Sequence, residues 1–166
     1  MFIYKIKDIG TIVSGGTPKT TENDYWNGDI SWITPKDLST NKSKYIHYGE
    51  RNITDKGLSH SSSKMLPKGT VLLTSRAPIG YLAIAGKDLC TNQGFKSIIC
   101  NTEIIKPEYL YYLLNTKIDD LISISTGSTF LELSKSVFEE YQIKIHNLEE
   151  QQHIIDIQFM KGVQYV

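Results

Sequence analysis

The side chains that most often carry enzymatic chemistry are scattered along this chain of 166 residues. The histidines are His47, His60, His146 and His153. Metal centres and activated nucleophiles bring histidine, cysteine or carboxylate groups together at short, recognisable spacings, and no such spacing occurs here. The glycine-rich phosphate loops, the G-x-S-x-G elbow and the H-E-x-x-H motif are also absent. This pattern favours a binding module over an enzyme, with structural or surface roles for the histidines.

The two cysteines and the overall composition indicate an ordinary globular domain. Cys90 and Cys100 stand in apolar, strand-like stretches and form no C-x-x-C pair, so we expect two buried free thiols. Hydrophobic residues make up 40% of the chain and charged residues 22%. No apolar run approaches the roughly 18 residues of a membrane helix. The N-terminus has no signal-peptide layout, so we expect a cytoplasmic domain without membrane contact.

The charges are balanced in total but unevenly distributed. Lysine and arginine number 18, as do aspartate and glutamate, which argues mildly against a lone nucleic-acid binder. Residues 61–99 nevertheless hold five cations and only one carboxylate, whereas residues 139–150 hold four glutamates and one lysine. Two kinds of contact surface would explain this distribution, and two unrelated solvated faces would explain it equally well.

Turn residues and apolar periodicity predict a mixed α and β fold. The expected strands have β-rich or alternating apolar patterns bounded by turn residues. They are residues 30–34, 45–48, 70–75, 79–85, 95–100 and 141–145, with 70–75 and 79–85 forming a hairpin, and an extended stretch at 130–133. The expected helices begin at a capping side chain or at a proline. They are residues 8–13, a turn after Thr54, residues 107–124 and a short helix capped by Ser134 or Ser136.

A terminal amphipathic helix is expected from Leu148 to about Met160. Asn147 and Glu150 have the spacing of a capping box. The apolar positions that should meet a partner or the core are Leu148, Ile154, Ile155 and Phe159, with Ile157 beside them. A helix of this length is marginal alone in water. Its apolar stripe therefore packs either on the domain's own core or on another chain.

Several blocks of the sequence, in order, resemble one protein family. The first is the stretch from Ser14 to Ser39, which contains Gly15-Gly16-Thr17-Pro18 and Thr34-Pro35-Lys36-Asp37-Leu38. The later blocks are residues 54–58, 66–72, 75–80, 91–96, 109–115, 125–129 and 148–152. Together they are similar to a target-recognition domain of type I restriction-modification specificity subunits. The resemblance covers roughly residues 4–158.

The resemblance implies a non-catalytic DNA-recognition role. In that family each recognition domain is a mixed α/β unit with a small twisted sheet and flanking helices, and it reads one half of a split target in double-stranded DNA. Long helices set the spacing and, with the domains, bind methyltransferase subunits that use S-adenosylmethionine, while a separate subunit cuts DNA. The implied organisation here is a recognition domain at 1–146 and a truncated conserved helix at 147–166, with no cofactor of its own.

The resemblance also implies which side chains contact DNA. Base reading needs donors and acceptors that fit the major groove, and cations that fix the register on phosphates. The candidates are Lys36, Lys64, Lys68, Arg76, Asn92, Gln93, Lys96, Ser128 and Lys135. Arg76 is the first candidate because the tight loop between two strands would hold its fork-shaped guanidinium donor rigidly. A structural salt bridge for Arg76, turn hydrogen bonds for Asn92 and Gln93, and a plain helix-stop loop around Ser128 are the alternatives. Tyr25 and Trp26 are interpreted as packing aromatics.

Three functional hypotheses follow. The first is a specificity subunit, or a half-subunit that dimerises through its terminal helix, directing a partner adenine methyltransferase and a restriction subunit. The second is a truncated chain that binds the methyltransferase subunit and modulates assembly without reading DNA. The third is an enzyme with an unrecognised site, such as a nuclease fused to a recognition domain. The chain could be a natural half-subunit, a remnant or a fragment.

Overall fold

The computed structural model describes the backbone of residues 1–164 and the side chains of residues 1–162. Tyr165 and Val166, which end the predicted segment 147–166, lie outside the described residues. The strands are β1 (Phe2–Lys5), β2 (Gly10–Val13), β3 (Trp26–Ile33), β4 (Tyr45–Ile46), β5 (Arg51–Ile53), β6 (Val71–Ser75), β7 (Ile79–Ala85), β8 (Cys90–Thr91), β9 (Ser97–Cys100) and β10 (Gln142–Ile145). The helices are α1 (Ile6–Ile9), η1 (Asn23–Tyr25), α2 (Pro35–Thr40), α3 (Asp55–Ser59), α4 (Pro107–Asn115), α5 (Ile118–Ser123), α6 (Lys135–Glu140) and α7 (Leu148–Gln164).

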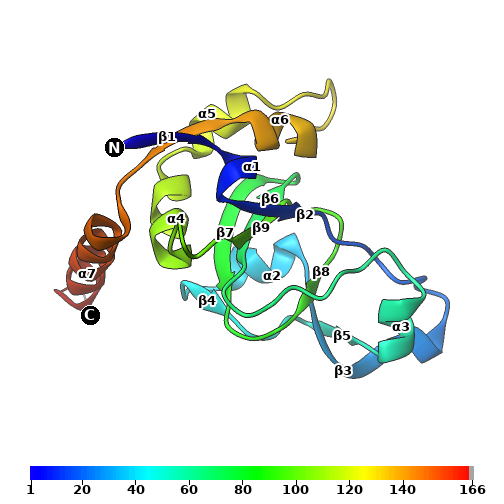
Figure 1. Ribbon diagram of the computed structural model, residues 1–166. Coiled ribbons are helices and arrows are strands. Elements are labelled where there is room, and N and C mark those ends of the chain that lie inside the picture. Colours follow the sequence, from blue (N-terminus) through cyan, green and yellow to red (C-terminus); the bar gives the residue numbers. More distant parts are fainter. Residues whose placement is uncertain (165–166) are drawn as a thin grey trace.

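The described strands form three sheets, which confirms the mixed α and β class but divides the predicted single sheet. The central sheet has the order β2-β9-β6-β7-β4, and only the β4–β7 pair in it is parallel. A second sheet has the order β5-β3-β8, and β1 pairs with β10 in a third. Figure 1 shows the second sheet and α3 as a lobe at the lower right, away from β1 and β10 at the top.

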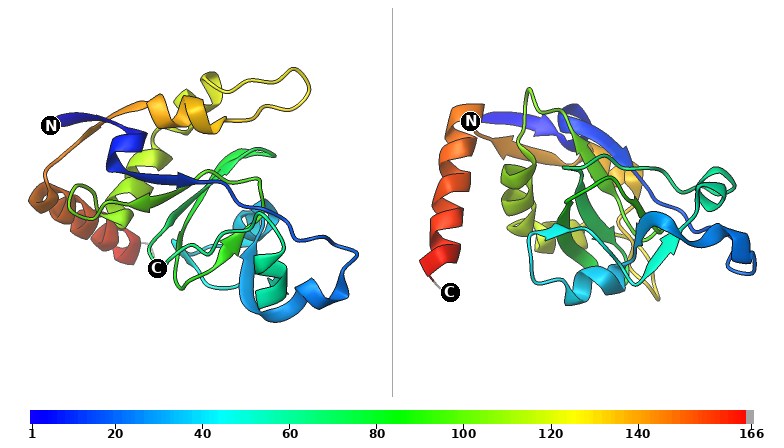
Figure 2. Two further views of the ribbon diagram at one scale, coloured as in Figure 1. Left: turned by 45° about the vertical axis from the view of Figure 1, so that its right-hand side comes forward. Right: turned by 90° about the horizontal axis from the view of Figure 1, so that it is seen from below.

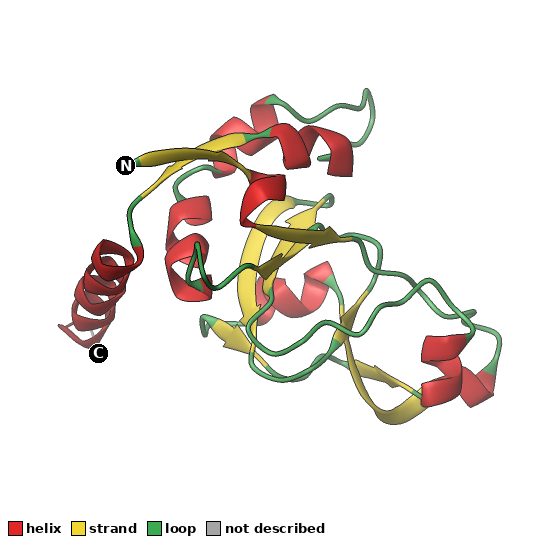
Figure 3. Ribbon diagram, viewed as in Figure 1, coloured by secondary structure: helices red, strands yellow, loops and turns green. Residues whose placement is uncertain are grey.

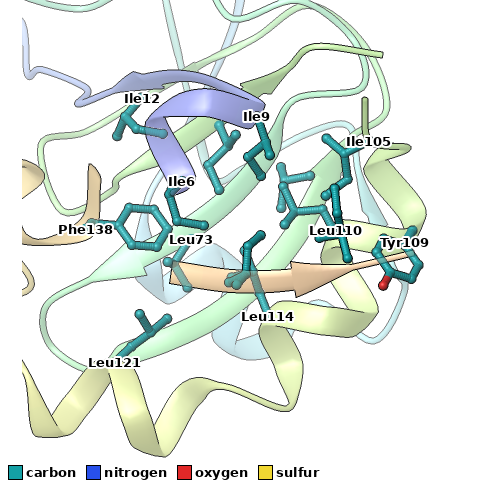
Figure 4. Packing of buried hydrophobic residues seen from close by; sticks show 14 of the residues in the cluster. Ile6, Ile9, Ile12, Leu73, Ile105, Tyr109, Leu110, Leu114, Leu121 and Phe138 are labelled. Carbon is teal, nitrogen blue, oxygen red and sulfur yellow. The ribbon is translucent and has the colours of Figure 1, made fainter. Parts of the chain in front are cut away.

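The predicted hairpin of β6 and β7 is the centre of the molecule. All five residues of β6 are buried, as expected for a strand covered on both faces. Val71 and Leu73 face a cluster formed with α1, α4, α5 and α6, and Leu72 faces a second cluster with α2 and β4. Figure 4 shows the first cluster, in which Ile6, Leu114 and Phe138 converge from different elements. The hairpin is therefore held rigidly from both sides.

Several local predictions are confirmed. Thr54 caps α3 by accepting a hydrogen bond from the Gly57 amide (3.0 Å), and Pro107 stands in the first turn of α4. Ser134, rather than Ser136, caps α6 and accepts from the Val137 amide. Asn147 and Glu150 form the expected reciprocal capping box at the start of α7.

Two predicted helices were wrong in extent. The expected helix at 8–13 is only α1, and residues 10–13 form β2 because they pair with the edge of β9. Gly10 allows this approach, since a Cβ there would lie 2.4 Å from the Ile99 carbonyl oxygen. The expected helix at 107–124 is two helices. The Thr116 hydroxyl donates to the Leu113 carbonyl (2.7 Å) and the Thr116 and Lys117 amides bond only three residues back, which tightens and ends the turn.

The terminal helix is longer than predicted and lies at one side of the molecule. It extends to Gln164 rather than to about Met160. Figures 1 and 2 show α7 beside α4, joined to the rest by the segment after β10, and Figure 3 shows that its neighbours there are helical. Among the described residues, no helix is both long enough and apolar enough to cross a bilayer.

Candidate nucleic-acid interface

Ser75, at the end of β6, joins three segments that are far apart in the sequence. Its backbone amide donates to the Gly94 carbonyl (2.9 Å), and its carbonyl accepts from the Leu133 amide (2.9 Å). Its hydroxyl accepts from the ammonium of Lys96 (3.3 Å). The tip of the β6–β7 hairpin, the turn at 92–94 and the loop at 126–132 therefore meet at one place. We call these segments, together with Lys135, the basic end of the molecule.

Arg76 follows Ser75 on a well-supported hairpin tip. The Thr74 hydroxyl fills an irregularity in the β6–β7 pairing by donating to the Pro78 carbonyl (2.7 Å) and accepting from the Tyr81 amide (2.8 Å). The Arg76 side chain is partly exposed and lies 3.9 Å from a carboxylate oxygen of Glu132. A weak, partly solvated pair of this kind leaves the guanidinium available for a second acceptor. The structure thus shows the ion pair that was the alternative role for Arg76, and it also leaves the guanidinium accessible.

Lys96 lies beneath this surface. Only 6% of the residue is exposed, and its ammonium lies 3.7 Å from Glu132. Burial lowers the pKa of Lys96, although the Glu132 carboxylate opposes that shift. The sequence predicts Lys96 as a direct contact, but its burial places the ammonium where it can hold Glu132 and Ser75 in position.

The basic end carries more positive than negative charge. Arg76 and Lys135 are both near enough to Lys96 to lower its pKa further, and Glu132 is the one carboxylate that opposes them. Lys135 begins α6 and is exposed. Lys64 lines the same surface hollow as Lys135, beside the end of β2. Four of the predicted cations therefore gather here, where they can attract a polyanion.

The two predicted amides lie on the adjacent turn. The Asn92 carboxamide oxygen accepts from the Gly94 amide (2.9 Å), which is the turn-forming alternative, and Gln93 is exposed and accepts from the Thr17 hydroxyl. Pro35, which precedes Lys36, lies close to this turn, since a Cβ built on Gly94 would be 3.1 Å from the Pro35 Cγ. The Lys36 ammonium is well exposed and lies 3.4 Å from Glu50.

Two further predicted residues differ in their placement. Ser128 is exposed in the loop at 126–132, within the basic end. Lys68 precedes β6 at the opposite end of the hairpin, where its backbone amide binds Asp88 (2.8 Å). The strand between them puts Lys68 on the order of 20 Å from Arg76. The structure therefore gathers eight predicted residues on or near one end and leaves Lys68 outside.

Sequence reasoning missed Glu132, Ser75 and Phe130. Glu132 binds the cations, Ser75 connects the segments, and Phe130 exposes 81% of its surface beside them. From the sequence, Ser75 was predicted only as a strand residue, because its hydrogen-bond partners Gly94, Lys96 and Leu133 are distant in the sequence. Phe130 stood in a stretch predicted as extended, and nothing local marks an apolar side chain as exposed.

The predicted partner helix is half docked. Leu148, Ile154 and Ile155 are partly buried, the two isoleucines against the main core, whereas Phe159 is 62% exposed. Gln151, which is fully buried, fixes the docking. Its side chain accepts from the Lys106 amide (2.9 Å) and donates to the carbonyls of Ile104 (2.9 Å) and His146 (2.8 Å). Gln151 is a fourth residue that the sequence did not single out, although it lies in the block at 148–152.

The remaining candidates have structural surroundings. Trp26 is buried edge-to-face against Trp32, and Tyr25 stacks on His60, as the packing interpretation predicts. Cys90 and Cys100 are free thiols, and burial raises their pKa values to about 11 and about 12. Within the described part of the chain, no three His, Cys, Asp or Glu residues lie where they could hold a metal ion together.

Comparison with known families identifies the fold and the family. Residues 2–160 match the model of the type I restriction modification DNA specificity domain. The chain belongs to this family.

Two curated relatives extend the match. The chain is 52% identical over 157 residues to the type I restriction enzyme MjaIX specificity subunit of Methanocaldococcus jannaschii, covering 93% of this chain and 36% of that protein. It is 27% identical over 157 residues to the EcoR124I/EcoR124II specificity subunit of Escherichia coli, covering 90% of this chain and 38% of that protein. The specificity-family chain described here thus spans little more than a third of the length of these relatives.

Solved structures support the same fold. One from a study of the assembly and conformational transition of the type I R-M system superposes with a TM-score of 0.76 at 20% identity, covering 98% of this chain and 38% of that one. The HsdS subunit from Thermoanaerobacter tengcongensis gives a TM-score of 0.73 at 19% identity, covering 98% and 37%. The predicted recognition-domain fold of this specificity-family chain is therefore confirmed.

Proposed function

We propose that this chain reads one half of a bipartite DNA target for a type I restriction-modification system. The observation that carries the proposal is the basic end, where cations and amides from distant segments converge on a rigid hairpin tip in a domain of the specificity family. Arg76 presents two parallel donors that suit the O6 and N7 atoms of guanine. Lys64, Lys135 and Lys36 lie on or beside the same end and suit phosphate contacts that set the register.

The catalytic steps belong, in this proposal, to partner subunits. A methyltransferase subunit would bind S-adenosylmethionine and transfer its methyl group to adenine, and a restriction subunit would cut DNA. This chain would contribute binding and orientation. The exposed second half of α7, with Ile157, Phe159 and Met160, suits a contact with the methyltransferase subunit or with a second copy of this chain. A symmetric pair of chains would read a split palindrome.

The deciding experiment is sequence-resolved mapping of adenine methylation in cells that express this chain with its methyltransferase subunit. A new split motif would support the proposal, and a palindromic motif would in addition indicate a symmetric dimer. An asymmetric motif would indicate pairing with a different recognition domain. Absence of new methylation, with both proteins present and folded, would contradict the DNA-reading role.

The second candidate function is a chain that binds the methyltransferase subunit and modulates assembly. The zero net charge of the chain suits it, and the exposed apolar residues of α7 would provide the methyltransferase contact that both functions require. It predicts capture of the methyltransferase subunit together with sequence-independent or absent DNA binding. Comparing specific and random duplexes in the same binding assay separates the two functions.

A further inference from the structure

Phe130 is the most exposed large apolar side chain in the described part of the molecule. Of its surface, 81% is accessible, and the neighbouring Leu131 is 44% accessible. Exposed apolar groups cost free energy in water, and a contiguous group of them commonly marks a contact surface. Phe130 and Leu131 line a shallow apolar hollow together with Pro78 of the hairpin tip and Ile122 of α5. The apolar hollow therefore lies at the basic end of the molecule.

The loop that carries Phe130 is closed by backbone hydrogen bonds. The amide of Thr126 donates to the Glu132 carbonyl (3.1 Å), and the amide of Glu132 donates to the Thr126 carbonyl (2.9 Å). Gly127 has a φ of 132°, and a Cβ there would lie 2.0 Å from the Phe130 carbonyl oxygen, so only glycine fits. In Figures 1 and 2 the segment between α5 and α6 projects from the body of the molecule. Phe130 is therefore carried, largely exposed, on a closed and projecting loop.

The charges around Phe130 indicate the class of partner. Glu132 ends the same loop and lies within 4 Å of both Arg76 and Lys96, and Lys135 follows shortly after. The cores of protein–protein interfaces are depleted in charged residues and lysine is under-represented there. Phe130 instead lies two residues before Glu132, which two cations contact, and it lines a hollow with Ala77 and Pro78, which directly follow Arg76. An apolar ring beside cationic groups suits a polyanion with apolar groups on its bases. In the DNA major groove that apolar group is the methyl of thymine.

We propose that Phe130 contacts a thymine methyl group in the half-site and is a specificity-determining residue. This inference rests on the proposed DNA-reading function and adds one base preference to it. Arg76 supplies hydrogen bonds and Phe130 an apolar contact from the adjoining loop. The closed loop lowers the conformational entropy that must be lost on binding.

The test uses the purified chain and duplexes that it enriches from a randomised library. Each thymine of the enriched site is replaced in turn by uracil, which removes only the methyl group, and affinities are measured for the wild type and for Phe130→Ala. For the wild type, one replacement should weaken binding roughly fourfold, the effect of one buried methyl group. Phe130→Ala should weaken binding to the thymine duplex at least as much and should be insensitive to that replacement.

Phe2→Ala is the matched control, because Phe2 is an exposed phenylalanine on β1, outside both the basic end and α7. It should leave both affinities unchanged. Equal sensitivity of the wild type and Phe130→Ala to every uracil would overturn the thymine contact, as would a loss of methyltransferase-subunit binding without a change in DNA affinity. If Arg76→Ala abolishes enrichment but Phe130→Ala does not alter it, only this inference fails. If the wild type enriches no sequence, the DNA-reading function fails with it.

Discussion

The loop at 126–132 and helix α7 both expose large apolar side chains, but the charged groups near them differ. Phe130 lies two residues before Glu132, whose carboxylate is within 4 Å of both Arg76 and Lys96. Phe159 stands on a helix whose described residues include Glu149, Glu150 and Asp156 against Lys161 alone. Although both segments expose apolar side chains, the class of partner that each one suits therefore differs.

We infer that the charge of each surface selects the class of partner, whereas the exposed apolar area supplies the contact. A polyanion is attracted to the basic end and repelled by α7, because electrostatic potentials act before close contact is made. The α7 surface suits a protein, whose interface would cover apolar residues and leave the carboxylates at its rim. The docking of α7 by Gln151 keeps these two surfaces on different sides of one rigid domain.

The largest expected effect is at Arg76. Arg76→Ala should weaken binding to the specific half-site by about 1–3 kcal/mol if the guanidinium reads guanine. Arg76→Lys should restore phosphate attraction but not base preference, since lysine lacks the planar fork. Lys68→Ala, at the other end of the hairpin, is the control and should bind normally. Fluorescence anisotropy at fixed salt measures all three, and equal weakening on every sequence would make Arg76 a phosphate contact instead.

The next effect concerns the docking of α7. Gln151→Ala leaves the Lys106 amide and the Ile104 and His146 carbonyls without their buried partner, which should cost about 1–3 kcal/mol. Hydrogen exchange along α7 should accelerate, while the base preference of the basic end is retained. Gln152→Ala removes a solvent-exposed amide that binds only the Asp156 carboxylate and should change neither quantity. Unchanged exchange in Gln151→Ala would show that the docking depends on Ile154 and Ile155.

A smaller effect, on the salt dependence of DNA affinity, is expected at Lys64 and Lys135 and distinguishes phosphate contacts from base contacts. Lys64→Ala and Lys135→Ala should each lower the slope of log affinity against log salt by about one, with a uniform loss on all sequences. Lys68→Ala should leave the slope unchanged. A salt titration with a specific and a random duplex provides the measurement. A normal slope in Lys135→Ala would remove the start of α6 from the interface and restrict the basic end to its loops.

The smallest expected effect is on stability at acid pH and concerns Glu140, the last residue of α6. Glu140 binds the ammonium groups of Lys5 (2.6 Å) and Lys7, and these hydrogen bonds lower its pKa to about 2 from 4.5. A carboxyl group with a lowered pKa stabilises the fold fully above its unfolded value, and the contribution disappears as the pH falls through about 2. Glu140→Gln should therefore flatten acid unfolding between pH 5 and pH 2 only slightly, because exposed pairs contribute little. Circular dichroism during acid titration tests this, and DNA binding near neutral pH should be unaltered.

Local elements were predictable where the signal was local. Capping residues such as Thr54, Ser134 and Asn147 identified helix starts correctly, because each hydrogen bond is made within three residues. The β6–β7 hairpin was predictable from apolar runs on either side of Arg76-Ala77-Pro78. Residues 10–13 were misassigned because pairing with β9, far along the chain, overrides local helix preference. The break at Thr116 depends on a hydroxyl that donates to the backbone carbonyl of Leu113, which apolar periodicity does not record.

The family, the mixed α and β class, the hairpin and the amphipathic character of α7 were predictable from the amino-acid sequence alone. These depend on the order of short motifs and on periodicity, which a chain carries before it folds. Which cations form one surface depends on the folded arrangement, because Ser75 joins residues 94, 96 and 133 through hydrogen bonds that no local pattern encodes. The folded arrangement alone buried Lys96, excluded Lys68 from the basic end and left Phe130 exposed, since burial is a property of packing between distant segments.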